Sequence, residues 1–139
     1  MKRALTALAV LAFATTANAS EKKDEKDKVT QQYVAISPVA LPVVVNNKVV
    51  NYVFVNVRID LTPSADSPRL REREPYFRDA LVRAAHRTPF TLAGDYTKID
   101  EARLKAAVMR DAITIAGPNA IKGVQVLNQA PKSSRVSAR

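Results

Sequence analysis

The chain of 139 residues contains no cysteine, one histidine and three glycines. The absence of cysteine excludes disulfides, and a single histidine cannot supply the about four nitrogen or sulfur ligands of a structural zinc site. Gly94, Gly117 and Gly123 lie too far apart to form a glycine-rich phosphate loop. The domain must therefore be held together by an apolar core, which a chain of this length can form.

The residue types needed for catalysis are present, but not in catalytic arrangements. His86 lies beside Arg83 and Arg87, whose charges would repel a metal cation, and its position suits a surface histidine at a helix end. No serine lies in a nucleophile-elbow sequence, and the serines fall in predicted linker, loop and tail segments: Ser20, Ser37, Ser64, Ser67, Ser133, Ser134 and Ser137. We therefore expect no enzyme, and no catalytic, cofactor-binding or metal-binding site.

The carboxylates most easily paired in the sequence have ordinary explanations. They alternate with arginines, start a predicted helix or flank a loop: Glu72, Glu74, Asp100, Glu101, Asp60 and Asp66. We expect solvated or capping roles for all of them. The adjacent Tyr76 and Phe77 are expected to pack in the core or at its border.

The first residues follow the order of a secretory signal peptide. Met1 is followed by Lys2 and Arg3, then by an apolar run over residues 4–14 and by a small-x-small site that ends at Ala19. The run is shorter than the about 20 apolar residues that span a bilayer. We expect export from a bacterial cytoplasm to the periplasm with removal of residues 1–19. The alternative is an uncleaved segment that holds the chain at the inner membrane.

The chain carries 22 basic and 13 acidic residues, a net charge of +9. Such a balance suits anionic lipid or wall polymers as well as nucleic acid. Nucleic acid is not expected as a partner, because we expect export and because the aromatic residues are not interleaved with basic ones in a stacking pattern. The simpler interpretation is that arginine and lysine solvate the helix faces and the tails.

Residues 20–32 are dominated by charges of both signs and contain almost no large apolar side chain, so we expect a charged, disordered linker, followed by a domain over residues 33–129. Pro38 and Pro42 interrupt the first apolar run, so residues 33–45 predict an edge strand or two short strands. A tight turn is expected at residues 46–48. Residues 49–61 alternate with period two, which predicts a strand with its odd-numbered residues buried and its other face polar toward the far end.

After a loop over residues 62–68, apolar residues recur at helical spacing. We expect a helix over residues 75–87 with Pro75 in its first turn, preceded by an irregular or separate turn over residues 69–74. A second helix starts at the N-cap Asp100 and ends at Gly117. Val124 and Val126 predict a short last strand, and residues 130–139 a basic, disordered tail. The expected fold is α+β, with two helices on one face of a small hairpin-based antiparallel sheet in the order β-β-α-α-β.

Four segments mark this order of elements: YVAISP at 33–38, YVFVNVRIDL at 52–61, EPYFRDALV at 74–82 and IKGVQVL at 121–127. With them, the chain resembles the FliL family of flagellar basal-body-associated proteins. The resemblance covers roughly residues 33–129. It implies a periplasmic, stomatin-like α+β domain that forms homo-oligomeric rings at the flagellar stator and supports motility. It supplies no catalytic residues.

The chain departs from that family at its start. Family members usually carry an uncleaved membrane helix behind a cytoplasmic tail, whereas here only three residues precede a signal-like run. The predicted function is therefore an exported protein-interaction module, a soluble or signal-peptide-bearing variant that contacts itself and an envelope complex. Peripheral association with the inner membrane is compatible with it. The alternative is an envelope-associated structural protein that binds an anionic wall or membrane surface and is unrelated to motility.

Overall fold

The computed structural model describes residues 31–135. Its elements, in chain order, are β1 (Tyr33–Val45), β2 (Lys48–Leu61), α2 (Ser67–Glu72), α3 (Glu74–Arg87), α4 (Glu101–Ala116) and β3 (Ile121–Pro131). The expected α+β class and the order of two strands, helices and a last strand are confirmed. The expected signal peptide and most of the charged linker lie outside the described residues.

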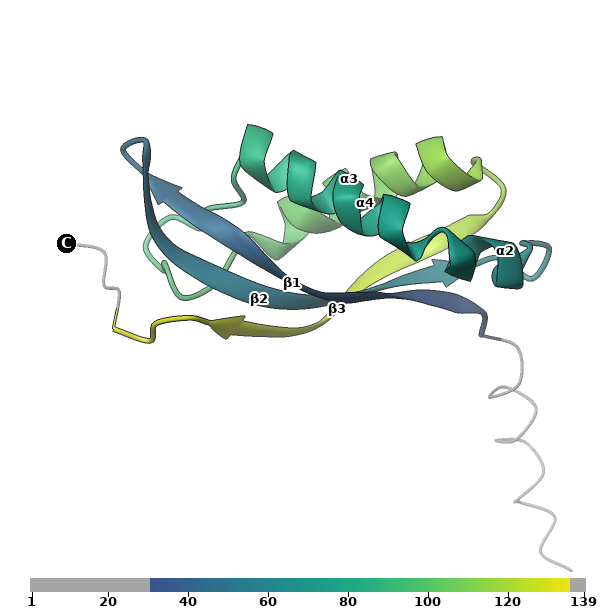
Figure 1. Cartoon of the computed structure of the whole chain (residues 1–139), viewed down its shortest axis with the longest axis horizontal. Helices are drawn as coiled ribbons and strands as arrows, with labels where there is room; N and C mark the ends of the chain where they lie inside the picture. Colours follow the sequence, from purple (N-terminus) through teal and green to yellow (C-terminus); the bar gives the residue numbers. More distant parts are fainter. Residues whose placement is uncertain (1–30, 136–139) are drawn as a thin grey trace, which may run out of the picture.

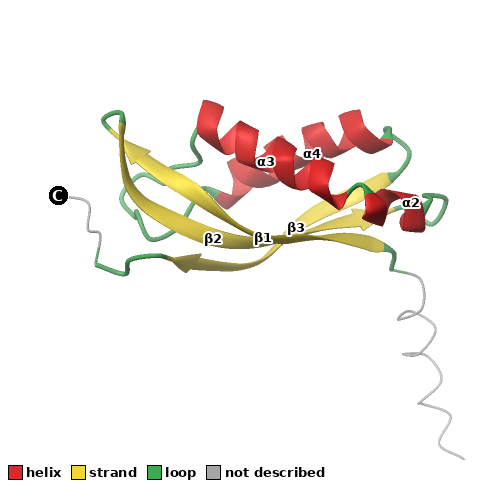
Figure 2. Ribbon diagram, viewed as in Figure 1, coloured by secondary structure: helices red, strands yellow, loops and turns green. Residues whose placement is uncertain are grey.

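The three strands form one antiparallel sheet in the order β1-β2-β3, so β2 is the central strand. The helices lie together on one face of this sheet, and no described element covers the other face (Figures 1 and 2). Helix α3 packs on β1 and on α4, while α4 packs on β3. The core is the layer between sheet and helices, where Leu41, Ile59, Leu81 and Leu104 are fully buried.

The odd-numbered residues of β2 point into this core, as the period-two pattern predicts. The buried set is Asn51, Val53, Val55, Val57, Ile59 and Leu61, but not Val49, which is exposed at the start of the strand. Buried Asn51 has its hydrogen bonds satisfied, since its side-chain amide donates to the carbonyls of Tyr96 and Ser133, both at 2.9 Å. The loop after α3 and the residues that follow β3 are thereby attached to the central strand.

The turn between β1 and β2 consists of Asn46 and Asn47, both with left-handed backbone at φ 49° and 62°. Two consecutive residues in this region make the two-residue hairpin turn whose twist matches that of the strands. Asparagine tolerates the region better than most residues, which explains the pair. The expectation of a tight turn is confirmed, except that Lys48 already belongs to β2.

Strand β1 is one continuous edge strand, which decides between the two predicted alternatives. Its pairing shifts between Ile36 and Val39, so Pro38 falls in a bulge, where a missing backbone donor is tolerated. Side chains from α3 and from the loop after it bond other backbone groups of β1. Ser37 N donates to Glu74 Oε1 at 2.9 Å, and the hydroxyl of Thr91 bonds both backbone polar groups of Val44. These contacts protect the β1 edge from pairing with another strand.

Helix α2 corrects the prediction for the segment before Pro75. Residues 62–68 were expected to be a loop and 69–74 irregular or a separate turn, but a six-residue helix begins at Ser67. Asp66 caps it by accepting from Arg69 N at 3.1 Å, and the proline in its first turn is compatible with a helix start. The main helix α3 then begins at Glu74 with Pro75 in its first turn, as predicted.

Helix α4 and strand β3 close the domain. Asp100 accepts from Arg103 N at 3.1 Å and Gly117 follows the helix with φ 94°, so both predicted ends are confirmed. Strand β3 is longer than predicted, because it continues to Pro131 rather than ending before residue 130. The residues expected to start the tail pair with the central strand, Ala130 with Phe54 and Pro131 with Val53. Backbone pairing holds this polar stretch in the sheet without an apolar side-chain pattern.

Candidate binding surfaces

His86 lies where the sequence places it, exposed near the end of α3. Its Nδ1 is 2.8 Å from the carbonyl oxygen of Val82, one turn earlier in the same helix. This bond fixes the ring to its own helix. Among residues 31–135, no group of three or more histidine, aspartate or glutamate side chains is placed to hold a metal ion.

Asp60 corrects the prediction that the carboxylates are solvated or capping. Its residue is only 7% exposed, and its Oδ1 lies 2.8 Å from Arg58 Nε, close but not aligned as a hydrogen bond. Its Oδ2 accepts a 2.6 Å hydrogen bond from Gln125 Nε2. Arg58 also stands 5.2 Å from the ring centroid of Tyr33. These side chains join all three strands on the face away from the helices, so Asp60 has a structural role.

The pKa of Asp95, in the loop between α3 and α4, departs from its ordinary value. The hydroxyl and the backbone N–H of Thr97 both donate to its carboxylate, and they lower the pKa of Asp95 below its ordinary value. The side chain stabilises a turn between α3 and α4. The half-buried carboxylate of Asp95 therefore has a structural role in this turn.

The first candidate binding surface is the uncovered face of the sheet. Even-numbered residues of β2 point to this face, and Tyr52 and Phe54 are 36% and 46% exposed there. Their partners on β1 are small, Pro42 for Tyr52 and Ala40 for Phe54, and Ala130 of β3 stands on the other side of Phe54. Small neighbours leave the aromatic rings open to solvent. We call this pair, with the neighbouring exposed Val50, the aromatic face.

The aromatic face was missed at the sequence level, although the signal was present. Residues 50, 52 and 54 of the strand are as apolar as the odd-numbered ones, so the first half of β2 has two apolar faces. A sheet with helices on one side only can bury just one of them. The charge of Lys132 near the Tyr52 ring, 5.9 Å from its centroid, marks the border of the aromatic face.

Tyr76 corrects a second expectation. It was placed in or beside the core, but it is 66% exposed on α3, while its neighbour Phe77 is buried as predicted. Consecutive helix residues point about 100° apart, so only one member of the pair can face the sheet. Tyr76 is therefore an isolated aromatic on the helical layer, and single exposed apolar side chains are common.

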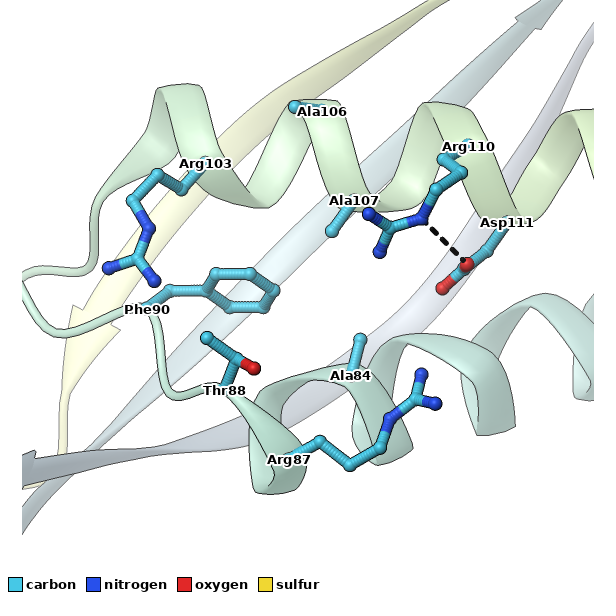
Figure 3. Close-up of a pocket in the computed structure, with 9 residues that line it drawn as sticks. All are labelled: Ala84, Arg87, Thr88, Phe90, Arg103, Ala106, Ala107, Arg110 and Asp111. Atoms are coloured by element: carbon cyan, nitrogen blue, oxygen red, sulfur yellow. Dashed lines mark ion pairs between the residues drawn. The ribbon is translucent and has the colours of Figure 1, made fainter.

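The second candidate surface is a groove between α3 and α4, made of two adjoining cavities of about 580 and 540 Å³. Figure 3 shows Arg87 of α3 and Arg110 of α4 projecting from opposite walls, with Arg103 at the end beside Phe90. The floor between them is formed by small residues such as Ala84 and Ala107. The second cavity continues the groove past Arg83 and His86. We call this feature the arginine groove.

No helix within residues 31–135 combines the length and the apolarity needed to cross a bilayer. Comparisons of the chain with protein-family models, with curated proteins and with solved structures yield no match. The candidates for function are therefore the two surfaces that the structure itself presents. They lie on opposite layers of the domain, one on the sheet and one on the helices, and each can be altered without touching the other.

Proposed function

We propose that this protein is an exported interaction domain whose aromatic face docks on another protein, in the first place a second copy of itself. The observation that supports this proposal is the exposure of Tyr52 and Phe54 on the central strand, on the sheet face that no described element covers. Exposed aromatic side chains in one patch are typical of interface centres. Export rests on the signal-like order of residues 1–19.

The size of the aromatic face predicts weak self-association. A Phe or Tyr side chain buries about 150–250 Å² when fully covered, so covering the exposed parts of Tyr52 and Phe54 removes roughly 150 Å² of surface per copy from water. At about 25 cal/mol per Å², this contributes roughly 4 kcal/mol per copy before the cost of association. Two copies together gain roughly 8 kcal/mol and the cost is about 4–15 kcal/mol, so burial of these rings alone gives a dissociation constant in the millimolar range or weaker.

The test is the concentration dependence of the molecular mass, measured by sedimentation. The double variant Tyr52→Ser with Phe54→Ser should remain monomeric at concentrations at which the unaltered chain associates. Tyr76→Ser is the matched control, because it removes an exposed aromatic ring from the helical layer and should leave association unchanged. Equal loss of association in both variants, or a monomer at every concentration, would contradict self-docking through this face.

A FliL-like role in the bacterial envelope is part of the same proposal. It is supported by the sequence signatures of residues 33–129 and is compatible with the α+β order of the domain. The test is deletion of the gene with fractionation of a tagged copy in the same strain. Lost swimming with flagella still assembled, and protein in the periplasm or on the inner membrane, would support the role. Normal swimming would refute a direct part in the motor.

A second candidate function is binding to an anionic wall or membrane surface, and the arginine groove favours it. Guanidinium groups collected in a concave site suit anionic ligands. Binding to isolated envelope material that weakens with added salt would support this function. Self-association that persists in salt would support the first one, since burial of apolar surface is not screened by ions.

A further inference from the structure

We infer that the arginine groove binds a linear polyanion whose charged groups are phosphates, an inference that rests on the second candidate function and names its ligand. The groove runs between α3 and α4 on the outer, helical layer of the domain (Figure 3). It is separate from the aromatic face, which lies on the other side of the sheet. Loss of polyanion binding would therefore leave the proposed self-association untouched.

The cations of the groove are only partly compensated. Within residues 31–135, Arg87 and Arg103 form no ion pair, and Arg83 is paired with exposed Asp79 at 2.8 Å. Asp111 is the carboxylate that lines both cavities, and it stands 3.6 Å from Arg110, longer than a charge-assisted hydrogen bond. The cavity of about 580 Å³ thus gathers three guanidinium groups against one carboxylate, an excess of positive charge that attracts an anion.

The spacing of the charges favours a chain of anionic groups over a single ion. Arg83 and Arg87 are one helical turn apart, about 6 Å along α3 at 1.5 Å per residue. Arg103 and Arg110 are separated by about two turns, or roughly 10 Å, along α4. One small anion cannot contact all of these groups, whereas an extended polymer lying in the groove meets them in succession. The alanine floor lets such a polymer lie low between the helices.

The type of cation indicates the chemistry of the ligand. The basic side chains that line the two cavities are arginines and His86, and no described lysine is among them. Guanidinium forks donate paired hydrogen bonds to phosphate and carboxylate oxygens. A tetrahedral phosphate can accept from both walls at once, from Arg87 and from Arg110, which a planar carboxylate does less well. A flat membrane surface cannot enter a groove, so the ligand of the groove is a phosphate chain and not a bilayer.

The test is calorimetric titration of the chain with inorganic tripolyphosphate at low ionic strength, with orthophosphate for comparison. We expect tripolyphosphate to bind more tightly. The variant Arg87→Gln with Arg103→Gln should bind about tenfold more weakly, equivalent to about 1.4 kcal/mol. The control Arg78→Gln with Lys122→Gln removes the same charge from exposed positions outside the groove and should change the affinity by less than twofold. All four side chains are exposed, so the fold is expected to persist.

A second variant gives an effect of opposite sign. Asp111→Asn removes the carboxylate from the groove and should strengthen tripolyphosphate binding several-fold, while Glu72→Gln, an exposed acid elsewhere, should not. Equal weakening by the groove and control pairs would show diffuse attraction by net charge and overturn the inference. Tighter binding to polyglutamate than to tripolyphosphate would overturn the phosphate assignment. A third result would overturn the groove as the binding site. In it, the chain does not bind tripolyphosphate, but it binds phosphatidylglycerol vesicles and still does so in the variant Arg87→Gln with Arg103→Gln.

Discussion

The pair Arg58–Asp60 and the pair Arg83–Asp79 have the same closest nitrogen–oxygen distance, 2.8 Å, but differ in exposure. The Arg58 and Asp60 side chains are 23% and 10% exposed, against 68% and 59% for Arg83 and Asp79. Replacing each aspartate by asparagine removes one charge at nearly constant volume. The two substitutions therefore compare a mostly buried ion pair with a solvated one in the same fold.

We expect Asp60→Asn to lower the free energy of unfolding by about 2–3 kcal/mol. Breaking a fully buried pair costs roughly 3–5 kcal/mol because one charge is left uncompensated, and Arg58 retains some access to water, which reduces the loss. Asp79→Asn should cost only about 0.3–0.5 kcal/mol, as for other exposed pairs one helical turn apart. The assay is urea unfolding followed by circular dichroism, with the slope of the transition unchanged.

Added salt provides the control for this comparison. At 1 M salt the screening length is about 3 Å, so the small effect of Asp79→Asn should vanish while that of Asp60→Asn largely remains. If the two variants lose the same stability, or if salt removes both losses, the Asp60 carboxylate is solvated and its assigned structural role is wrong.

Three further predictions address the turn, the helical layer and pH. Asn46→Val should destabilise the domain by roughly 1–2 kcal/mol, because a β-branched residue is strained at φ 49°. Urea unfolding measures this loss, and an unchanged stability would argue against the left-handed turn. Leu81→Ala should lower the free energy of unfolding by about 2–5 kcal/mol because Leu81 is fully buried, whereas Tyr76→Ala on the same helix should change it by no more than about 0.5 kcal/mol. Thermal unfolding measures both, and similar losses for the two variants would show that the described orientation of α3 is wrong. Because hydrogen bonds from Thr97 lower the pKa of Asp95, its carboxylate stabilises the fold above its ordinary pKa of 3.8, and this contribution is lost as the pH falls through the lowered pKa. Asp95→Asn should therefore be less stable than the unaltered chain at pH 6 but equally stable in strong acid. A stability difference that does not depend on pH would refute this prediction.

The strands and helices with strong periodicity or clear end signals were predictable. Period two over residues 49–61 gave the central strand and its buried face, and Asp100 and Gly117 marked both ends of α4. These features depend on local physical chemistry, namely side-chain alternation and helix capping. They require no knowledge of distant parts of the chain.

The features that were missed depend on partners far apart in the sequence. The end of β3 is polar and pairs with β2 through its backbone, so its sequence carries no strand pattern. Asp60 is covered because Tyr33, Arg58 and Gln125 meet beside it, and Gln125 is distant in sequence. The arginine groove likewise arises only when α3 and α4 are placed side by side. No local rule connects Arg87 to Arg110.

The central claim is that the aromatic face is the contact surface, and the most direct test is hydroxyl-radical footprinting at low and high protein concentration. The account predicts that Tyr52 and Phe54 are oxidised more slowly at the concentration at which the chain associates, while Tyr76 on the helical layer reacts equally fast at both. Association with unchanged labelling of Tyr52 and Phe54, or with protection of Tyr76 alone, would contradict it.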